Sequence, residues 1–530
     1  MRIAVAADHG GVPLRDDVIE AIRDCGHEAL VLGAELNRSD DDYPTFAKLV
    51  GDAIAAGRAE RAVLICGSGA GVTVAVNKLP GVRACVAHDT YTAHQMVEHD
   101  ACNVLTLGAR VIGAEPAKEC VRAFVGATFS GAERHRRRLG EVIRLEREAH
   151  PSPLQALHRA GQSIWLDHIS RALLETGTLA RYVSGLWLTG LTSNPTIFEH
   201  AIAGSADYDD AIRCRLDRGL SAHDLFFEIA LEDIRAAAAL FRPVYDATGG
   251  TDGFVSLEVS PTLADDTEGT LSEAKRLHGE AARPNVLIKV PGTKAGVVAI
   301  EALIYAGIPI NVTLLFSREH YLAAAEAYLR GLERRVQDGS SPNVASVASL
   351  FVSRWDAASA AKLPDDLRNR LGIAVAQRTY QAYRGLLTSA RWKRLADAGA
   401  QPQRLLWAST SAKDPALPDT YYVSALAAEQ TVNTMPEATL LAFSRHGSLE
   451  ALLSTDPSAA EAVIAGVERA GIDVDALAQD LQIKGRDSFD QSFAKLLRSI
   501  EGKASALRGA HGQGAEHPGA VAATAARAPQ

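Results

Sequence analysis

Short apolar runs alternate with amphipathic stretches along the first 125 residues of the chain. The apolar runs have the length and composition of buried strands, and the stretches between them, such as Leu14–Asp24 and Tyr43–Ala56, have helical spacing. This alternation is typical of βαβ units, in which crossover helices join parallel strands. We therefore predict a doubly wound parallel sheet. Its expected strands are Ile3–Ala7, Ala29–Leu32, Ala62–Cys66, Ala84–Ala87 and Val104–Leu107.

The spacing between apolar runs becomes longer after a charged helix expected over Ala132–Ala149. The stretch His150-Pro-Ser-Pro153 should stop that helix, because proline cannot continue it. Beyond it, apolar runs recur with longer helical segments between them, which favours a (β/α)₈ TIM barrel. The expected strands are Ser163–Leu166, Leu186–Thr189, Gly253–Leu257, Val286–Ile288, Pro309–Thr313, Ala345–Leu350, Leu405–Ala408 and a weaker Thr431–Asn433.

The predicted fold class is thus α/β, with a Rossmann-like doubly wound sheet followed by a barrel. We expect one domain over residues 1–149, a linker over 150–153 and the barrel over 154–504. The last stretch is rich in Gly, Ala and Pro and has no periodicity, so residues 505–530 are predicted to be a disordered tail.

Charge and cysteine content narrow the function classes. The net charge is −9 and no long basic block is present, which argues against a nucleic-acid partner. No apolar run has membrane-spanning length, and the N-terminus resembles a strand rather than a signal peptide. The six cysteines form no CxxC pair, so we expect reduced thiols in a cytoplasmic protein.

Lys289 is the most informative residue of the second half. It lies in Asn285–Gly292 near the end of a short apolar run, where an ammonium group loses hydration and its charged form is disfavoured. A free amine can attack a ketone and form a Schiff base. Alone, such a lysine would more often extend toward solvent or pair with a carboxylate. Other polar residues, however, follow the remaining expected strands: Asp167, Asn194, Glu258, Asn311, Thr313, Ser349, Arg354 and Ser409.

These residues stand in blocks that resemble transaldolases over roughly residues 154–500, and the longer class of transaldolases fits best. The resemblance implies transfer of a three-carbon dihydroxyacetone unit between phosphorylated sugars, without metal or cofactor. The blocks are LTSNPTIF (191–198), VSLEVSP (255–261), VLIKVPGT (286–293), INVTLLFS (310–317), SLFVSR (349–354) and TVNTMPEATL (431–440).

The resemblance also implies a role for each matched residue. Lys289 would form the Schiff base, Asp167 would be the acid/base residue, and Glu258 would shuttle protons through a water. Thr313 would position that water, and Arg354 would bind phosphate. The groups that would hold the dihydroxyacetone moiety are Asn194, Asn311 and Ser349.

One position departs from the pattern. Some transaldolases have an arginine two residues after the serine that matches Ser409, whereas Ser411 stands there in this chain. We expect Lys413 to supply the second phosphate charge, with Ser409 in the substrate site. A fructose 6-phosphate aldolase shares the catalytic lysine, so it remains an alternative to a transaldolase.

The first half has its own candidate site at Cys66-Gly-Ser-Gly-Ala-Gly71. A strand that enters a glycine-rich turn and then a helix presents backbone N–H groups to an anion. The turn is not the GxGxxG of a dinucleotide fold. Cys66 could act as a base there, although a single buried cysteine is by default inert.

This segment resembles ribose-5-phosphate isomerase type B over roughly residues 1–148. The matching blocks are AADHGG (6–11), DYP (42–44), CGSGAG (66–71), VNK (76–78), EHDACN (98–103), GARVIG (108–113) and RHRRR (134–138). The resemblance implies that Cys66 moves the proton, Ser68 handles the proton on the neighbouring oxygen, and His99 opens the sugar ring with support from Asp8. The amides of Gly67, Gly69 and Gly71 would stabilise the enediolate. The implied phosphate or substrate binders are His9, Tyr43, Asp100, Arg110, Arg134 and Arg138.

Asp100 stands where this family often has Asn, which puts the hydrogen bonds near the enediolate in doubt. In this family the site lies between two subunits, so we expect a homodimer through the N-terminal domain. The sequence thus predicts a fusion of two pentose phosphate pathway enzymes whose partners are phosphorylated sugars. Two alternatives stay open for the first domain: isomerisation of a hexose 6-phosphate, or a dimerisation or sensing module without turnover.

Overall fold

The computed structural model describes residues 1–149 and 151–513 of the chain. These form two compact units, Met1–Pro151 and Ser152–Gln530, so the division falls inside the segment expected to link two domains. His150, the first residue of that expected linker, lies outside the described residues.

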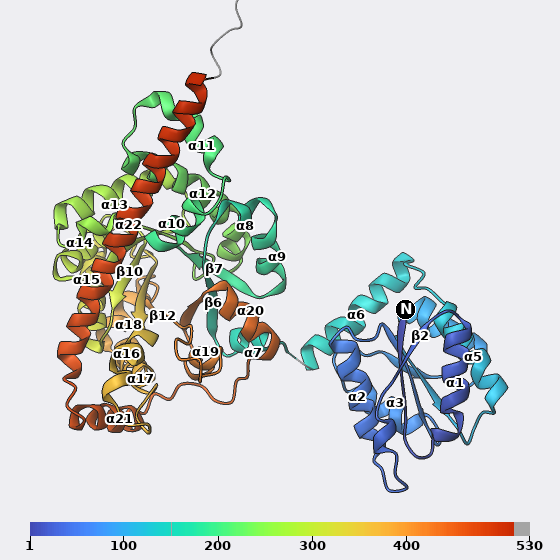
Figure 1. Cartoon of the computed structure of the whole chain (residues 1–530). Coiled ribbons are helices and arrows are strands. Elements are labelled where there is room, and N and C mark those ends of the chain that lie inside the picture. Colours follow the sequence, from blue (N-terminus) through green and yellow to red (C-terminus); the bar gives the residue numbers. More distant parts are fainter. Residues whose placement is uncertain (150, 514–530) are drawn as a thin grey trace, which may run out of the picture. The chain divides into compact units, whose positions relative to one another are not determined.

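The first unit is a five-stranded parallel sheet with the order β2-β1-β3-β5-β4. Its strands are β1 (Arg2–Ala7), β2 (Glu28–Val31), β3 (Arg61–Cys66), β4 (Ala84–Val86) and β5 (Val104–Gly108). Its helices are α1 (Val12–Asp24), α2 (Tyr43–Ala55), α3 (Ala70–Val76), α4 (Thr90–Asp100), α5 (Ala114–Gly126) and α6 (Glu133–Ala149). The predicted doubly wound α/β sheet is confirmed (Figure 1).

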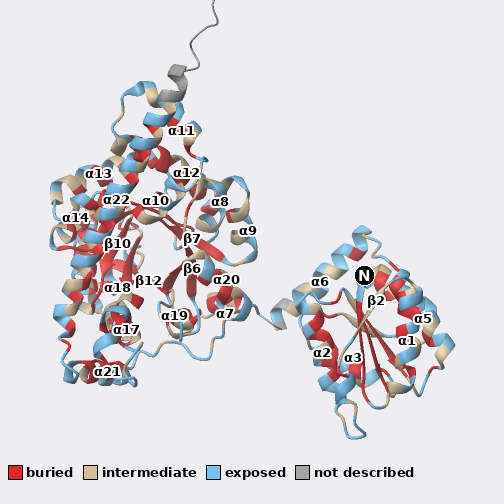
Figure 2. Ribbon diagram, viewed as in Figure 1, coloured by how far each residue is buried: buried red, intermediate tan, exposed pale blue. Residues whose placement is uncertain are grey.

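The helices cover both faces of this sheet because alternate residues of each strand point to opposite sides. Ile3 and Val5 of β1 pack in one apolar cluster with residues of α1, α4 and α5. Ala4 and Ala6 pack in a second cluster with residues of α2 and α3. The three central strands β1, β3 and β5 are buried and carry continuous apolar runs, as parallel strands covered on both faces do, whereas the edge strands β2 and β4 are partly exposed (Figure 2).

The second unit contains a closed barrel of eight parallel strands, which confirms the predicted TIM barrel. The expected weak eighth strand closes it, because β13 pairs with β6. The strands are β6 (Gln162–Asp167), β7 (Leu188–Thr192), β8 (Val255–Glu258), β9 (Val286–Pro291), β10 (Ile310–Leu315), β11 (Ser346–Phe351), β12 (Arg404–Ala408) and β13 (Thr431–Met435).

Helices surround the barrel and extend past its ends (Figure 1). They are α7 (Pro153–Arg159), α8 (Arg171–Glu175), α9 (Thr178–Gly185), α10 (Pro195–Ala203), α11 (Asp209–Arg213), α12 (Ala222–Ala247), α13 (Thr267–Ala281), α14 (Lys294–Tyr305), α15 (Arg318–Gln337), α16 (Ser353–Ser359), α17 (Leu371–Thr388), α18 (Ala390–Asp397), α19 (Tyr421–Ala425), α20 (Glu437–His446), α21 (Ser458–Arg469) and α22 (Val474–Gln513). Among the described residues, no helix is both long enough and apolar enough to cross a membrane.

Several boundaries differ from the sequence-based expectation, among them the start of β7 and the end of α22. Strand β7 begins two residues later than expected, at Leu188, after Trp187 with its left-handed φ of 57°. Helix α22 continues through Gln513, although a tail was expected from residue 505. Buried Ala504 and the bonds from Lys503 Nζ to Ser205 O and Asp209, both 2.6 Å, hold this end of the helix against the unit. The rest of the expected tail, 514–530, lies outside the described residues.

Candidate active sites

A cavity of about 140 Å³ lies at the carboxyl ends of the barrel strands, and we call it the barrel cavity. Eight residues expected in the second site line it: Asp167, Asn194, Lys289, Thr313, Ser349, Arg354, Ser409 and Lys413. They come from distant parts of the sequence, and parallel strands bring them to one end of the barrel.

Lys289 and Glu258 form a buried ion pair beside the barrel cavity. Lys289 Nζ lies 3.0 Å from Glu258 Oε2 and 3.1 Å from the carbonyl oxygen of Ser193, to which it donates a hydrogen bond. The two residues are neighbours in register on β8 and β9. Apart from this pair, neither Glu258 oxygen has a hydrogen-bond partner among the described residues. Burial raises the pKa of Glu258, although the ammonium group of Lys289 opposes the shift.

Asp167, the last residue of β6, faces the same cavity. Thr192 donates a hydrogen bond of 2.8 Å to Asp167 Oδ1, and Thr192 Oγ1 also lies 2.7 Å from Thr434 Oγ1. Burial raises the pKa of Asp167, while Lys289 and the Thr192 hydroxyl lower it in part. A carboxylate with a raised pKa accepts a proton more readily near neutral pH.

The other polar residues of the site differ in whether their side chains are hydrogen-bonded. Ser349 donates a 2.7 Å hydrogen bond to Asn311 Oδ1, and Asn311 Nδ2 donates to Ser256 Oγ, so Asn311 stands behind Ser349 rather than in the cavity wall. Thr313 Oγ1 is buried and has no hydrogen-bond partner in the described part of the chain. Asn194 caps α10 through the amide of Ile197, which fixes its side chain at the rim.

Two cationic side chains besides Lys289 line the barrel cavity, Arg354 and Lys413. The Arg354 guanidinium lies over the rings of Phe351 and Phe489, with centroids 5.1 and 5.9 Å from Cζ. Lys413 is exposed and donates a 2.8 Å hydrogen bond to Ser411. Two cations near one cavity can bind a phosphate group.

The sequence-based prediction missed several residues of the cavity wall. Thr192 and Thr434 follow the same rule as the predicted residues, since both stand at strand ends. Phe489 belongs to α22, where only its place in an apolar helical stripe distinguishes it. The other unpredicted members of the wall are Phe351, Ala408, Ser411 and Pro436.

In the first unit, one set of predicted residues gathers where β1, β3 and β5 end, and we call it the Cys66 group. Cys66 is buried, and the amide of Gly69, a residue with φ of 81°, donates a 3.1 Å hydrogen bond to its Sγ. Gly67 lies under Arg110, whose Nε would be 3.4 Å from a Cβ at that position. The other members are Asp8, His9, Tyr43, Ser68 and Gly71, and the Tyr43 ring covers Gly71.

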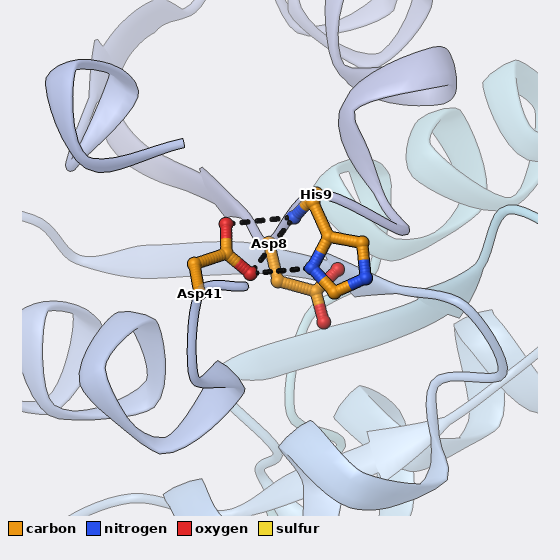
Figure 3. A group of neighbouring side chains, drawn as sticks. All are labelled: Asp8, His9 and Asp41. Atoms are coloured by element: carbon orange, nitrogen blue, oxygen red, sulfur yellow. Dashed lines mark hydrogen bonds and ion pairs between the residues drawn. The ribbon is translucent and has the colours of Figure 1, made fainter. Parts of the chain in front are cut away.

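Asp41, which the sequence did not indicate, holds His9 (Figure 3). The Asp41 carboxylate accepts hydrogen bonds from the His9 amide at 2.9 Å and lies 2.6 Å from His9 Nδ1. This pairing raises the pKa of His9. Burial raises the pKa of Asp8, whose Oδ1 accepts from the Gly11 amide. One potential ligand atom from each of Asp8, His9 and Asp41 lies within 4.8 Å of the other two, so these residues could also hold a metal ion.

The other predicted residues of the first unit form a second set, the His99 group, on α4 and α6. His99 stacks on His135, with ring centroids 4.2 Å apart, and His135 accepts a hydrogen bond from Arg134 Nε. Burial lowers the pKa of His135, the positive charges of Arg134 and Arg138 lower it further, and Asp100 opposes the shift. Within the described residues, no hydrogen bond or ion pair joins the His99 group to the Cys66 group.

Comparison with known families assigns each unit. The profile of the family described as Transaldolase/Fructose-6-phosphate aldolase matches residues 164–500. A transaldolase of Parafrankia sp. is 44% identical over 357 residues, which are 66% of this chain and 97% of that protein. A transaldolase of Neisseria gonorrhoeae is 45% identical over 341 residues, covering 64% of this chain and 97% of that protein.

The profile described as Ribose/Galactose Isomerase matches residues 3–142. The solved ribose-5-phosphate isomerase B of Clostridium thermocellum is 35% identical, covers 28% of this chain and 99% of that one, and has a TM-score of 0.27. The corresponding enzyme of Mycoplasma genitalium, solved with bound ribulose-5-phosphate, is 36% identical, covers 28% of this chain and 97% of that one, and has a TM-score of 0.27. The chain therefore belongs to the transaldolase/fructose-6-phosphate aldolase family through its barrel, and carries a ribose/galactose isomerase domain of the ribose-5-phosphate isomerase B type ahead of it.

Proposed function

We propose that the chain is a bifunctional enzyme of sugar phosphates, with a transaldolase in the barrel and an aldose–ketose isomerase in the first unit. The observation that carries the proposal is the buried Lys289, paired with Glu258 beside a cavity that Asp167 also faces. The transaldolase would move dihydroxyacetone from sedoheptulose 7-phosphate to glyceraldehyde 3-phosphate.

Schiff-base formation is the first step. The free amine of Lys289 adds to the C2 carbonyl of the donor ketose, and the carbinolamine then loses water to give a protonated imine. Glu258 would carry the protons through a water. Its two otherwise unpartnered oxygens and the unpartnered Thr313 Oγ1 support a water in this place, because buried polar atoms without partners are uncommon.

Carbon–carbon cleavage follows. Asp167 would remove the proton from the C4 hydroxyl, the C3–C4 bond would break, and its electrons would move into the iminium, leaving an enamine on Lys289. The aldehyde product leaves. The enamine then adds to the acceptor aldehyde, Asp167 returns the proton, and water hydrolyses the imine to release the new ketose.

Substrate orientation would come from the cations and the amides. Arg354 and Lys413, which both line the barrel cavity, would bind the phosphate. The hydroxyl groups of the donor would be held by Asn194, Asn311, Ser349 and Ser409. Of these, Asn311 would act through its hydrogen bond with Ser349, since it does not line the cavity.

In the first unit, Cys66 would take the C2 proton of ribose 5-phosphate and deliver a proton to C1 of the resulting enediolate, which gives ribulose 5-phosphate. The backbone amides of Gly67, Gly69 and Gly71 would stabilise the enediolate, and Ser68 would move the proton between oxygens. His9 and Arg110 would bind phosphate. Support comes from the position of these groups at the carboxyl edge of neighbouring parallel strands, where α/β sheets bind their ligands.

A homodimer through the first unit is part of the proposal. The His99 group and the Cys66 group form separate clusters, and a second chain could bring His99, Arg134 and Arg138 of one copy to Cys66 of the other. Large apolar side chains exposed on this unit, Tyr91 at 72% and Val111 at 59%, offer surface for such contact. Sedimentation of the purified chain should show a dimer.

The proposal is tested by assaying both activities on the whole purified chain. We expect isomerase and transaldolase turnover, and a dihydroxyacetone adduct on Lys289 after borohydride reduction. Cys66→Ala should abolish isomerisation and keep transaldolase activity, and Lys289→Ala should do the reverse. If either change removes both activities, or neither activity, the assignment of the two sites is wrong.

The same assay separates the alternatives. Dihydroxyacetone release from fructose 6-phosphate without an acceptor would indicate an aldolase in place of a transaldolase. Turnover of a six-carbon aldose phosphate in place of ribose 5-phosphate would change the isomerase substrate. Binding of ribose 5-phosphate without turnover would indicate a sensing module. We propose a cytoplasmic location, which the six free cysteines support.

A further inference from the structure

Helix α22 carries a stripe of three residues that lies over the mouth of the barrel, and we call it the α22 stripe: Gln482, Gly485 and Phe489. They stand three and four positions apart, so they share one face of the helix. The long red helix of Figure 1 belongs to the barrel unit and comes last in the chain.

Phe489 contacts two cations of the barrel cavity at once. Its ring is 5% exposed and lines the cavity. The ring centroid lies 5.7 Å from Lys289 Nζ and 5.9 Å from Arg354 Cζ. These distances are within reach of cation–π attraction, which is stronger where water is excluded.

Gly485 leaves the space that Arg354 occupies. A Cβ at this position would lie 3.2 Å from Arg354 Nη1 and 3.0 Å from Leu314 Cδ2. A side chain at this position would therefore press on the guanidinium, which lies against Phe351 and Phe489, and Arg354 or Leu314 would have to shift to admit it.

Gln482 fixes the helix to the strands of the site. Its Nε2 donates to Gly292 O, just beyond β9, at 3.1 Å and to Leu314 O of β10 at 2.9 Å. Leu314 has a left-handed φ of 59°, an unfavourable conformation for leucine that follows directly after Thr313. These hydrogen bonds hold α22 against the ends of β9 and β10, the strands that carry Lys289 and Thr313.

We infer that the α22 stripe is part of the transaldolase site and that Phe489 is a positioning residue, which holds the Arg354 guanidinium for the substrate phosphate. The inference rests on the proposed transaldolase function. Without the ring, Arg354 loses one of its two aromatic contacts and samples more conformations. Ketose donors that carry a phosphate should then bind less well, whereas donors without a phosphate should be affected little.

Phe489→Leu and Phe489→Ala test this inference. Leu keeps an apolar side chain and removes the π face, and Ala removes both. Ile483→Ala on the exposed side of α22, where Ile483 is 50% exposed, is the matched control. KM and kcat are measured with fructose 6-phosphate and with fructose as donors, and the thermal midpoint of each variant is recorded.

We expect KM for fructose 6-phosphate to rise about tenfold in both Phe489 variants, the change that roughly 1.4 kcal/mol produces. The values for fructose and for Ile483→Ala should stay near wild type. Equal loss with both donors would show a merely structural role and overturn the inference, as would unchanged kinetics. If the wild-type chain forms no borohydride-trapped adduct, the proposed function itself fails and the inference with it.

Discussion

Glu258 Oε2 lies 3.0 Å from Lys289 Nζ, and both side chains are buried where β8 and β9 run side by side. Pairing with a carboxylate was one of the non-catalytic explanations for a lysine at this strand end. It is compatible with catalysis, because burial raises the pKa of Glu258 and lets it exchange protons at a pH where an exposed glutamate would stay ionised.

Glu258→Gln is expected to slow imine formation about 100-fold, because the amide cannot carry a proton to or from the carbinolamine. Gln has nearly the same shape, and its oxygen can still accept a hydrogen bond from Lys289, so the barrel should stay folded. The rate of adduct formation under borohydride measures the effect. Glu268→Gln at an exposed position is the control. An unchanged trapping rate would remove Glu258 from the proposed mechanism.

Thr192→Val is expected to move the acid limb of the transaldolase pH profile to higher pH. The Thr192 hydroxyl donates to Asp167 and lowers the pKa of that carboxyl against the larger effect of burial. Without the hydroxyl the pKa of Asp167 rises further, so the base is protonated at a higher pH. The dependence of kcat/KM on pH measures this shift.

Thr192→Ser keeps the hydroxyl and should keep the wild-type profile. If Thr192→Val lowered kcat/KM by the same factor at every pH, the hydroxyl would act on packing alone. If the acid limb of the pH profile is absent in Asp167→Asn, Asp167 is the carboxyl group whose titration produces that limb.

Much of the barrel site could be predicted because one rule places it. Polar residues at the ends of parallel strands meet at one end of the barrel, so Asp167, Ser349 and Lys289 could be grouped from strand positions alone. Thr434 obeys the same rule but lies near the end of the eighth strand, whose apolar pattern is weak. The expected start of β7 was wrong because the backbone conformation of Trp187 leaves no mark in hydropathy.

Contacts that depend on packing between distant segments could not be predicted. Phe489 reaches Lys289 only because α22 crosses the barrel mouth, and the sequence shows no more than an apolar helical stripe. Asp41 reaches His9 from a loop 32 residues away, and one aspartate among Asp40, Asp41 and Asp42 has no distinguishing signal.

Asp41→Asn is expected to weaken sugar-phosphate binding by the isomerase as pH rises. Asp41 raises the pKa of His9, so His9 keeps its positive charge to a higher pH than an isolated histidine. The charge is present below this pKa and is lost as pH rises through it. The variant should lose the charge at a lower pH, and KM for ribose 5-phosphate should increase earlier in the titration.

Asp40→Asn, at the preceding exposed position, is the control and should follow the wild-type curve. If KM for Asp41→Asn depended on pH in the same way as KM for the wild type, His9 would not bind the substrate in its charged form. The measurement is KM for ribose 5-phosphate between about pH 5 and pH 8, the range in which histidine titrates.

Gln482→Ala is expected to destabilise the barrel unit by about 1–3 kcal/mol, because it leaves the carbonyl oxygens of Gly292 and Leu314 without their hydrogen bonds from α22. The left-handed backbone of Leu314 would also lose a contact that holds it. Thermal unfolding followed by calorimetry measures the change. Gln479→Ala, at an exposed position of the same helix, removes a side chain of the same kind and should leave the midpoint unchanged. Equal midpoints for the two variants would show that the apolar contacts of α22 alone hold this helix. The side-chain amide of Gln482 would then contribute nothing to the strand ends that carry Lys289 and Thr313.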